Sequence, residues 1–323
     1  MGGLLSPPSD PSDDTRPRGD VGDQPLTAIV LLSSSFKAPP PDVVGLRSNR
    51  MFGTSNMFNS LLDRGYQVEV HSHAHAILSV DFPDAVKELE DVVGGLSIPI
   101  EEIIGSGGGE TKGTQRLRKG LAAVGWTKMN FVVERRINGR PREAVSHEID
   151  HVKEFGPGVV ACEIEWNNKD PFFDRDLENF KRLHADGAIS VGIIITRGTS
   201  MQNDMRNMIN RYAEENGIDD HHDLERLGIG LTPKQRAAID RRVAKGISFR
   251  EAWVNKFVAD KYGAATTHWA KLEDRVRRGV GNPCPLVLIG LPSSIVTFGE
   301  GITIADIEAE EEELEDAGIL PEE

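Results

Sequence analysis

The sequence predicts an α/β protein with a central mixed β-sheet flanked by helices. Residues 189–198, ISVGIIITRG, form the continuous β-branched run that is typical of a fully buried strand. Asn138-Gly139 separates two segments of alternating polarity, which is a strong β-hairpin signal. Residues 82–96, FPDAVKELEDVVGGL, have the apolar spacing, acidic first turn and terminal glycines of a helix. One chain with a buried strand, a hairpin and helices favours a mixed sheet covered by helices.

The elements before residue 160 are predicted from local signals. Leu26 is expected to begin the ordered part, in the apolar run LTAIVLLSS. The elements expected next are a helix at 56–64, a strand at 66–78, the helix at 82–96, a glycine-rich loop from 105, an amphipathic helix ending near 125, and the hairpin strands at 126–137 and 142–155.

The second half of the chain is predicted to continue the alternation of strands and helices. The turn GPG at 156–158 is expected to return the chain beside a strand at 159–166, VVACEIEW. The elements expected after it are a helix at 174–184, the buried strand, a mostly helical stretch at 201–280 and a last strand at 284–290.

Composition sets the domain organisation. Residues 1–25 are rich in Pro, Asp, Ser and Gly and are predicted to be disordered, and residues 301–323 form an acidic tail. The tail contributes −10 and residues 1–25 contribute −3 to the net charge of −14, so about −1 remains for the rest. We expect one domain over 26–300 with a mostly helical insertion at about 201–262.

The expected location is the cytoplasm. The sequence has no apolar signal region and no run long enough to span a bilayer, which favours a soluble protein. Cys162 and Cys284 lie in separate apolar segments and are predicted to be buried thiols, without a disulfide or a metal.

Carboxylates in the strand at 159–166 give the strongest functional signal. Glu163 and Glu165 are two residues apart and therefore point to the same face. The GPG turn could bring Asp150 of the preceding strand close to Glu163. Burying carboxylates is costly unless they are paired or bind a metal, and Mg²⁺ takes oxygen ligands of this type. The alternative is an edge strand with its acids facing solvent.

At this point the residues resemble a known family. Asp150 followed by ACEIEWNNKDPFFDRDLENFKRLHADGAISVGIIITR resembles type II restriction endonucleases of the BamHI/BglII kind, within the PD-(D/E)XK nuclease superfamily. The segments GGGETKGTQRLRKGLAAVGW, TTHWAKLEDRV and CPLVLIGL are also similar to that group. The resemblance implies a restriction-endonuclease-like core and Mg²⁺-dependent hydrolysis of double-stranded DNA at a short palindromic site. It also implies a homodimer and a cognate DNA methyltransferase.

The resemblance also implies roles for individual residues. Asp150 takes the "PD" position and Glu163 the first acidic position, and these two would bind the metal. Glu165 stands where lysine is usual and would orient or deprotonate the attacking water. Glu110 matches a helix glutamate that often completes such sites, although it could equally be an ordinary acid in a first helical turn. Ile149 precedes Asp150 in place of the usual proline.

Three other signals leave alternatives open. His71, His73 and His75 alternate along the strand expected at 66–78, where they could hold a metal or could be ordinary strand histidines. Residues 231–253 could be a DNA-reading helix pair or a packing unit. Arg197, after the buried strand, could contact phosphate or form a salt bridge at the strand end.

In the segment after the acidic strand, Asn167, Asn168 and Lys169 could contact phosphate or the neighbouring helix. Asp174 or Asp176 is expected to cap the following helix, and Phe172 and Phe173 are expected in the core. Two further functions stay open: a repair or structure-specific nuclease of the same superfamily, and a non-catalytic DNA-binding module.

Overall fold

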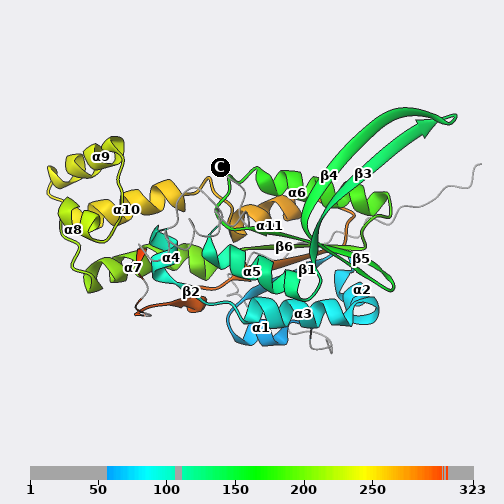
Figure 1. Ribbon diagram of the computed structural model, residues 1–323, viewed down its shortest axis with the longest axis horizontal. Helices are drawn as coiled ribbons and strands as arrows, with labels where there is room; N and C mark the ends of the chain where they lie inside the picture. The colour runs from blue at the N-terminus through cyan, green and yellow to red at the C-terminus, as the bar shows by residue number, and fades with distance from the viewer. Residues whose placement is uncertain (1–56, 106–110, 300, 302, 305–323) are drawn as a thin grey trace, which may run out of the picture. The chain divides into compact units, whose positions relative to one another are not determined.

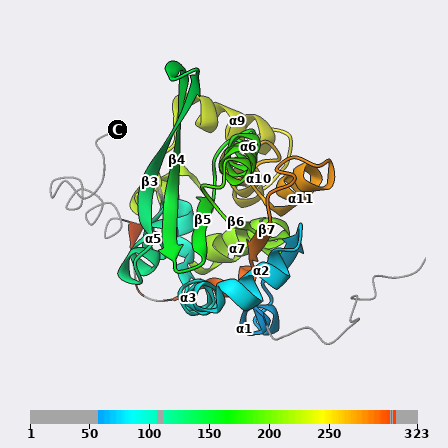
Figure 2. The same cartoon turned by 90° about the vertical axis from the view of Figure 1, so that its right-hand side faces the viewer.

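A six-stranded mixed sheet is the centre of the structure. The computed structural model describes residues 57–105, 111–299, 301 and 303–304. Within these residues the strand order of the large sheet is β1-β7-β6-β5-β4-β3 (Figures 1 and 2). Its strands are β1 (Gln67–His71), β3 (Thr127–Ile137), β4 (Arg140–Phe155), β5 (Gly158–Glu165), β6 (Val191–Arg197) and β7 (Leu286–Leu291). β5, β6 and β7 are parallel to one another, whereas β1, β3 and β4 run antiparallel to their neighbours. The predicted α/β class and mixed sheet are confirmed.

Helices cover both faces of this sheet. The helices before β6 are α1 (Asn59–Asp63), α2 (Ala74–Asp81), α3 (Pro83–Gly94), α4 (Ile100–Gly105), α5 (Lys112–Ala123) and α6 (Phe172–Ala185). Those after β6 are α7 (Thr199–Glu215), α8 (His221–Arg226), α9 (Pro233–Val243), α10 (Phe249–Lys261) and α11 (Trp269–Arg277). A short 3₁₀ helix at Ser293–Ile295 leads into β8 (Val296–Thr297), which pairs in parallel with β2 (Ile98–Pro99).

The two faces of the sheet belong to two different hydrophobic clusters. Val160, Cys162 and Ile164 of β5 lie in the larger cluster, which also contains residues of α2, α3, α5 and α7. Ala161, between them, lies in a smaller cluster with residues of α6 and α11. Since side chains alternate along a strand, the residues of β5 with odd numbers face α6. Gly192 of β6 permits this packing because a Cβ there would lie 2.5 Å from the ring of Phe180.

The hairpin of β3 and β4 forms as predicted. Asn138 and Gly139 join its strands with φ of 51° and 76°, the positive values that a two-residue type I′ turn requires. The distal part of the hairpin extends away from the other strands of the sheet (Figure 1). Gly156 and Pro157 then form the tight turn to β5, since Phe155 pairs directly with Gly158.

The strand predicted at 66–78 is wrong in its second half. β1 ends at His71, and Ser72 and His73 both have left-handed backbone conformations, with φ of 51° and 66°. The chain then forms α2, whose buried Ala74 and Leu78 are four residues apart on one helix face. In this short stretch the helical spacing of the buried apolar residues, and not the alternation of the histidines, corresponds to the observed structure.

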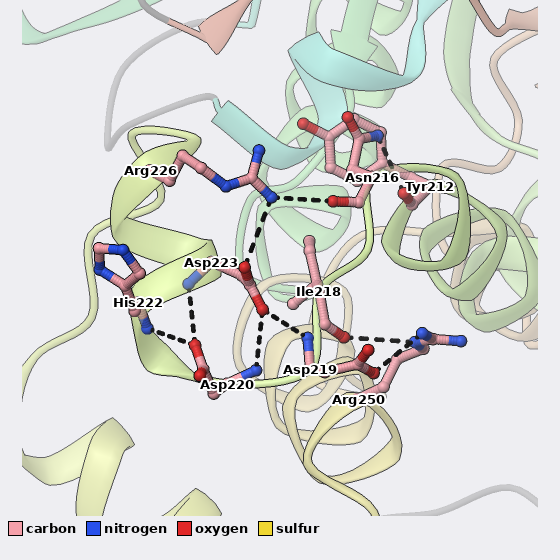
Figure 3. Close-up of polar contacts among 9 residues, drawn as sticks. All are labelled: Tyr212, Asn216, Ile218, Asp219, Asp220, His222, Asp223, Arg226 and Arg250. Atoms are coloured by element: carbon pink, nitrogen blue, oxygen red, sulfur yellow. Dashed lines mark hydrogen bonds and ion pairs between the residues drawn. The ribbon is translucent and has the colours of Figure 1, made fainter.

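The mostly helical stretch after β6 is confirmed as helical. Figure 3 shows how polar contacts join α7, α8 and α10. Asp220 begins α8 in a capping box with Asp223. Arg226 of α8 donates to the carbonyl of Asn216, 3.0 Å away, and Arg250 of α10 binds Asp219 at 2.9 Å. These contacts fix the start of α8 between its two neighbours.

The helix pair at 231–253 is also present, as α9 and the first part of α10. Its role in reading DNA stays a prediction.

Both cysteines are buried and free, as predicted. Burial raises the pKa of Cys284 to about 12, so this thiol stays protonated. None of the helices in the described part of the chain is long and apolar enough to cross a membrane.

Candidate active site

Strand β5 brings two glutamates into the protein interior. It lies between β4 and β6, away from either edge of the sheet, and Glu163 and Glu165 are 3% and 2% exposed. The alternative of an edge strand with solvent-facing acids is therefore wrong. Both side chains share the α6 face of the sheet with Ala161.

Asp150 lies at a β-bulge in β4. Thr127 of β3 pairs with Val152 and Met129 pairs with Ile149, so β4 has one extra residue at this point. Ile149 and Val152 consequently belong to the same hydrophobic cluster, although three residues in a regular strand would put them on opposite faces. Bulges of this kind change the direction of a side chain beside an active site.

The pairing of β4 with β5 places Asp150 beside Glu163. His151 and Cys162 form the last pair of this register, Asp150 and Glu163 are the next residues along the two strands, and the charge of Asp150 acts on Glu163. The side chain of Asp150 is 54% exposed and lies 3.8 Å from Nζ of Lys128. The site therefore has buried glutamates and a more accessible aspartate at its margin.

Burial and the repulsion of neighbouring charges make Glu163 and Glu165 hard to ionise. Burial raises the pKa of Glu163 well above its usual value, and the negative charges of Asp176 and Asp150 raise it further. Burial, followed by the charge of Asp176, raises the pKa of Glu165 to about 8. A nearby cation would reverse both effects, because it favours the ionised form.

Glu165 is held by two residues that follow it. Asn168 Nδ2 donates to its Oε2 at 2.8 Å, and Arg175 Nη2 lies 3.5 Å from its Oε1. The backbone is fixed as well, since Thr196 Oγ1 of β6 donates to the carbonyl of Glu165 at 2.6 Å. The carboxylate thus has a defined position before any substrate arrives.

Asp176 is a fourth carboxylate in this region. It lies in α6, is fully buried, and accepts hydrogen bonds at Oδ1 from Arg175. Within the part of the chain that the structure describes, its Oδ2 receives no hydrogen bond from a donor group, yet its carboxyl lies within hydrogen-bonding reach of Glu165. A proton shared between Asp176 and Glu165 gives each carboxyl group a hydrogen-bond partner. This arrangement agrees with the raised pKa of Glu165.

The helix cap predicted at Asp174 or Asp176 is wrong. α6 begins earlier, at Phe172, and Asp174 instead binds Arg275 Nε of α11 at 2.8 Å. A signal for Asp176 was present in the sequence, because it falls on the same helical stripe as the buried Phe173, Leu177 and Phe180. A charged residue in such a stripe indicates a buried polar site.

Of the two phenylalanines expected in the core, only Phe173 is buried. Phe172 is 37% exposed, and its ring centroid lies 4.5 Å from the guanidinium of Arg175.

Arg197 fits neither of its two predicted roles. It is fully buried at the end of β6, and its Nε donates to the carbonyl of Trp166 at 2.7 Å. Its Nη2 donates to Thr266 Oγ1 and to the carbonyl of Thr267, both at 2.6 Å. Arg197 therefore joins the segment after β5 to the segment before α11, without a carboxylate partner in the described structure.

The histidines do not form the expected strand face. His71 ends β1, where its Nε2 lies 3.1 Å from Glu69 Oε2, whereas His73 precedes α2 and His75 lies within it. Over the described residues, no group of three or more His, Cys, Asp or Glu side chains is arranged to hold a metal ion. The three-carboxylate metal set is thus not preformed there. Glu110 lies outside the described residues.

Two carboxylates are still compatible with Mg²⁺. This ion is commonly bound by one or two carboxylates, several waters and the phosphate oxygens of a substrate. Asp150 and Glu163 supply oxygen donors of this kind, and burial raises the pKa of Glu163 well above its usual value. The fold and site thus combine a mixed α/β sheet with acidic residues contributed by β4, β5 and α6.

Comparison with known proteins specifies the family. The family model described as restriction endonuclease BglII/BglIII matches residues 66–291, from the start of β1 to the end of β7. The chain belongs to this family and is a type II site-specific deoxyribonuclease that cleaves double-stranded DNA. A search of curated proteins found no match.

Proposed function

We propose that the protein is a Mg²⁺-dependent homodimer that hydrolyses both strands of DNA at a short palindromic site. The observation that carries the metal dependence is the burial of Glu163 and Glu165 on one face of β5, beside Asp150 and Asp176. Such a concentration of carboxyl groups is unfavourable unless a cation compensates it. A dimer with two-fold symmetry would match a palindromic site.

Each carboxylate has a separate role in this proposal. Asp150 and Glu163 would hold the metal, which would polarise the phosphate and lower the pKa of a bound water. Glu165 orients the attacking water and accepts its proton, since a bound cation would favour the ionised form of this carboxyl group. Glu110 assists the site, a role that rests on the family resemblance alone.

The position of Glu165 supports its role as a base. Asn168 and Arg175 hold its carboxylate, and the hydrogen bond from Thr196 fixes its backbone. A general base must lie within hydrogen-bonding reach of the proton that it removes, and a fixed carboxylate meets this requirement once substrate and water are present.

The cellular setting is also a proposal. Restriction enzymes act on DNA within the cell, so we expect a cytoplasmic protein whose host DNA is protected by a cognate methyltransferase.

The test is digestion of a mixed set of plasmids with purified protein, with Mg²⁺ or with EDTA. We expect discrete fragments with Mg²⁺ alone, and sequencing of their ends should give one palindromic site. Cleavage restricted to mismatched or branched DNA would indicate a repair nuclease instead, and absence of cleavage would contradict the proposal. Sedimentation of the protein with and without the DNA site tests the dimer.

A further inference from the structure

The carboxylate cluster has a cation at its margin that the sequence motif does not supply. β5 carries Glu165 where lysine is usual in the superfamily, so this strand provides no positive charge. Arg175, from α6, places its Nη2 3.5 Å from Glu165 Oε1. The side chain of Arg175 is 53% exposed, so it joins the buried acids to the surface that a substrate can reach.

Three contacts fix the direction of this guanidinium. Nε and Nη2 of Arg175 both bind Oδ1 of Asp176 at 2.8 Å, and Asp176 is fully buried and therefore immobile. The ring of Phe172 lies 4.5 Å from the guanidinium carbon, as in a cation–π contact. Glu165 completes the set. An exposed arginine normally samples many rotamers, whereas this one is restricted on three sides.

The guanidinium retains donors for a ligand. Arginine has five N–H groups in a planar fork, and the contacts with Asp176 and Glu165 use Nε and Nη2. Among the described residues, Nη1 of Arg175 has no hydrogen-bond partner. A phosphate oxygen is the ligand that this geometry suits, because the fork pairs with tetrahedral oxyanions.

The charge balance also favours an anionic ligand at this position. A phosphodiester that approaches Asp150, Glu163, Glu165 and Asp176 is repelled by each of these groups that is ionised. A metal ion bound by Asp150 and Glu163 would compensate one side of the phosphate. A cation on the α6 side would compensate the other and would stabilise the charge that develops on the phosphorane.

We propose that Arg175 contacts the scissile phosphate of the DNA and that Asp176 is its positioning residue. This inference rests on the proposed function and adds a substrate-binding residue to it. Arg175 donates its free N–H groups to a non-bridging oxygen and undergoes no covalent change.

The first experiment measures single-turnover cleavage of a duplex carrying the site identified by end sequencing. We expect Arg175→Ala to slow cleavage by about 100-fold or more, the effect of losing one donor to a transition-state oxyanion. Arg175→Lys should recover part of the rate, because it keeps the charge without the fork. Arg182→Ala is the matched control, since Arg182 lies on the same helix, is 54% exposed and binds Glu178. The cleavage rate of this variant should be unchanged.

The second experiment separates phosphate contact from a structural role. Binding is measured in the non-cleaving Glu163→Ala background, with a normal duplex and with one carrying an uncharged methylphosphonate at the scissile position. The methylphosphonate should weaken binding by about tenfold when Arg175 is present, the size of one charge-assisted hydrogen bond. It should have little effect once Arg175→Ala is added. Asp176→Asn should reduce the difference between the duplexes without removing it.

The outcomes are distinguishable. If the unchanged protein cuts no DNA, the proposed function fails and this inference fails with it. If the unchanged protein cuts DNA, and Arg175→Ala and Arg175→Lys both cut it as fast as the unchanged protein, only this inference is overturned. Equal weakening by the methylphosphonate with and without Arg175 would also overturn it, even if Arg175→Ala reduced cleavage through loss of folding.

Discussion

Two buried ionisable residues lie at the ends of neighbouring strands, and their charge states at neutral pH differ. Glu165 ends β5, Arg197 ends β6, and Glu165 pairs in register with Thr196 next to that arginine. Burial lowers the pKa of Arg197 to about 10, so this residue remains charged at neutral pH. Burial and Asp176 raise the pKa of Glu165 to about 8, so its metal-free form is mostly protonated there.

The difference lies in the partners of each group. Arg197 donates to three oxygen atoms of the loops that it joins and lies 5.0 Å from the ring centroid of Tyr262. These neutral partners are part of the fold, so the arginine has a structural role. Glu165 has one amide donor and one distant guanidinium, and its nearest carboxyl neighbour repels its charge. A buried ion whose partners are neutral groups of the fold supports the fold, whereas repulsion between neighbouring carboxyl groups favours binding of a cation.

The largest expected effect comes from removing a carboxylate of the site. Glu163→Ala should slow DNA cleavage by about a thousandfold or more, which corresponds to several kcal/mol of lost transition-state stabilisation. DNA binding, measured by gel shift, should be largely retained. Glu178→Ala, an acidic residue on the outer face of α6 paired with Lys181 and Arg182, is the control and should cut normally. Normal cleavage by Glu163→Ala would show that the site is wrongly assigned.

The structural arginine should instead affect stability. Arg197→Met leaves the carbonyls of Trp166 and Thr267 without a donor, and we expect the free energy of unfolding to fall by about 3 kcal/mol. Urea denaturation measures this change. Arg278→Met, at an exposed pair with Asp274, serves as the comparison and should change stability little. A loss below about 1 kcal/mol for Arg197→Met would contradict its role as a structural link.

A smaller effect is expected in the pH dependence of stability without metal. The pKa of Glu165 is raised in the folded protein, so between about pH 4.5 and 8 the folded state holds a proton that the unfolded state has lost. This group therefore makes the metal-free protein less stable as pH rises through that window. Glu165→Gln cannot ionise and should show a shallower decline in melting temperature from pH 5 to 8 in EDTA. Parallel curves for the two proteins would refute a raised pKa at Glu165.

The smallest effect should come from an exposed ion pair. Lys128 lies 2.7 Å from Glu148 and 3.8 Å from Asp150, and all three side chains are more than half exposed. Solvent screening limits such pairs, so Lys128→Ala should change the free energy of unfolding by less than about 0.5 kcal/mol. Calorimetry at low and high salt checks this value. If Lys128→Ala lowered the free energy of unfolding as much as Arg197→Met, buried and exposed charges would not differ in their contribution to stability.

Local sequence signals predicted most of the sheet. The turn at Asn138-Gly139 has the positive φ values that those residues favour, and the apolar run around Ile194 became the strand β6 within the sheet. The strand expected at 66–78 was partly wrong because alternating histidines and a helical repeat coexist there, and the packing of Leu78 selected the helix. Residues 1–56, with the expected start near Leu26, lie outside the described residues.

By itself the sequence determined the fold class, the hairpin and the pair of glutamates on one face of β5, because these depend on spacing along a single element. Only the tertiary structure decided that Asp176 and Arg175 belong to the same region and that Arg197 does not. Charges from separate elements interact through distances and burial that arise when α6 packs on the sheet, and no local pattern specifies these quantities.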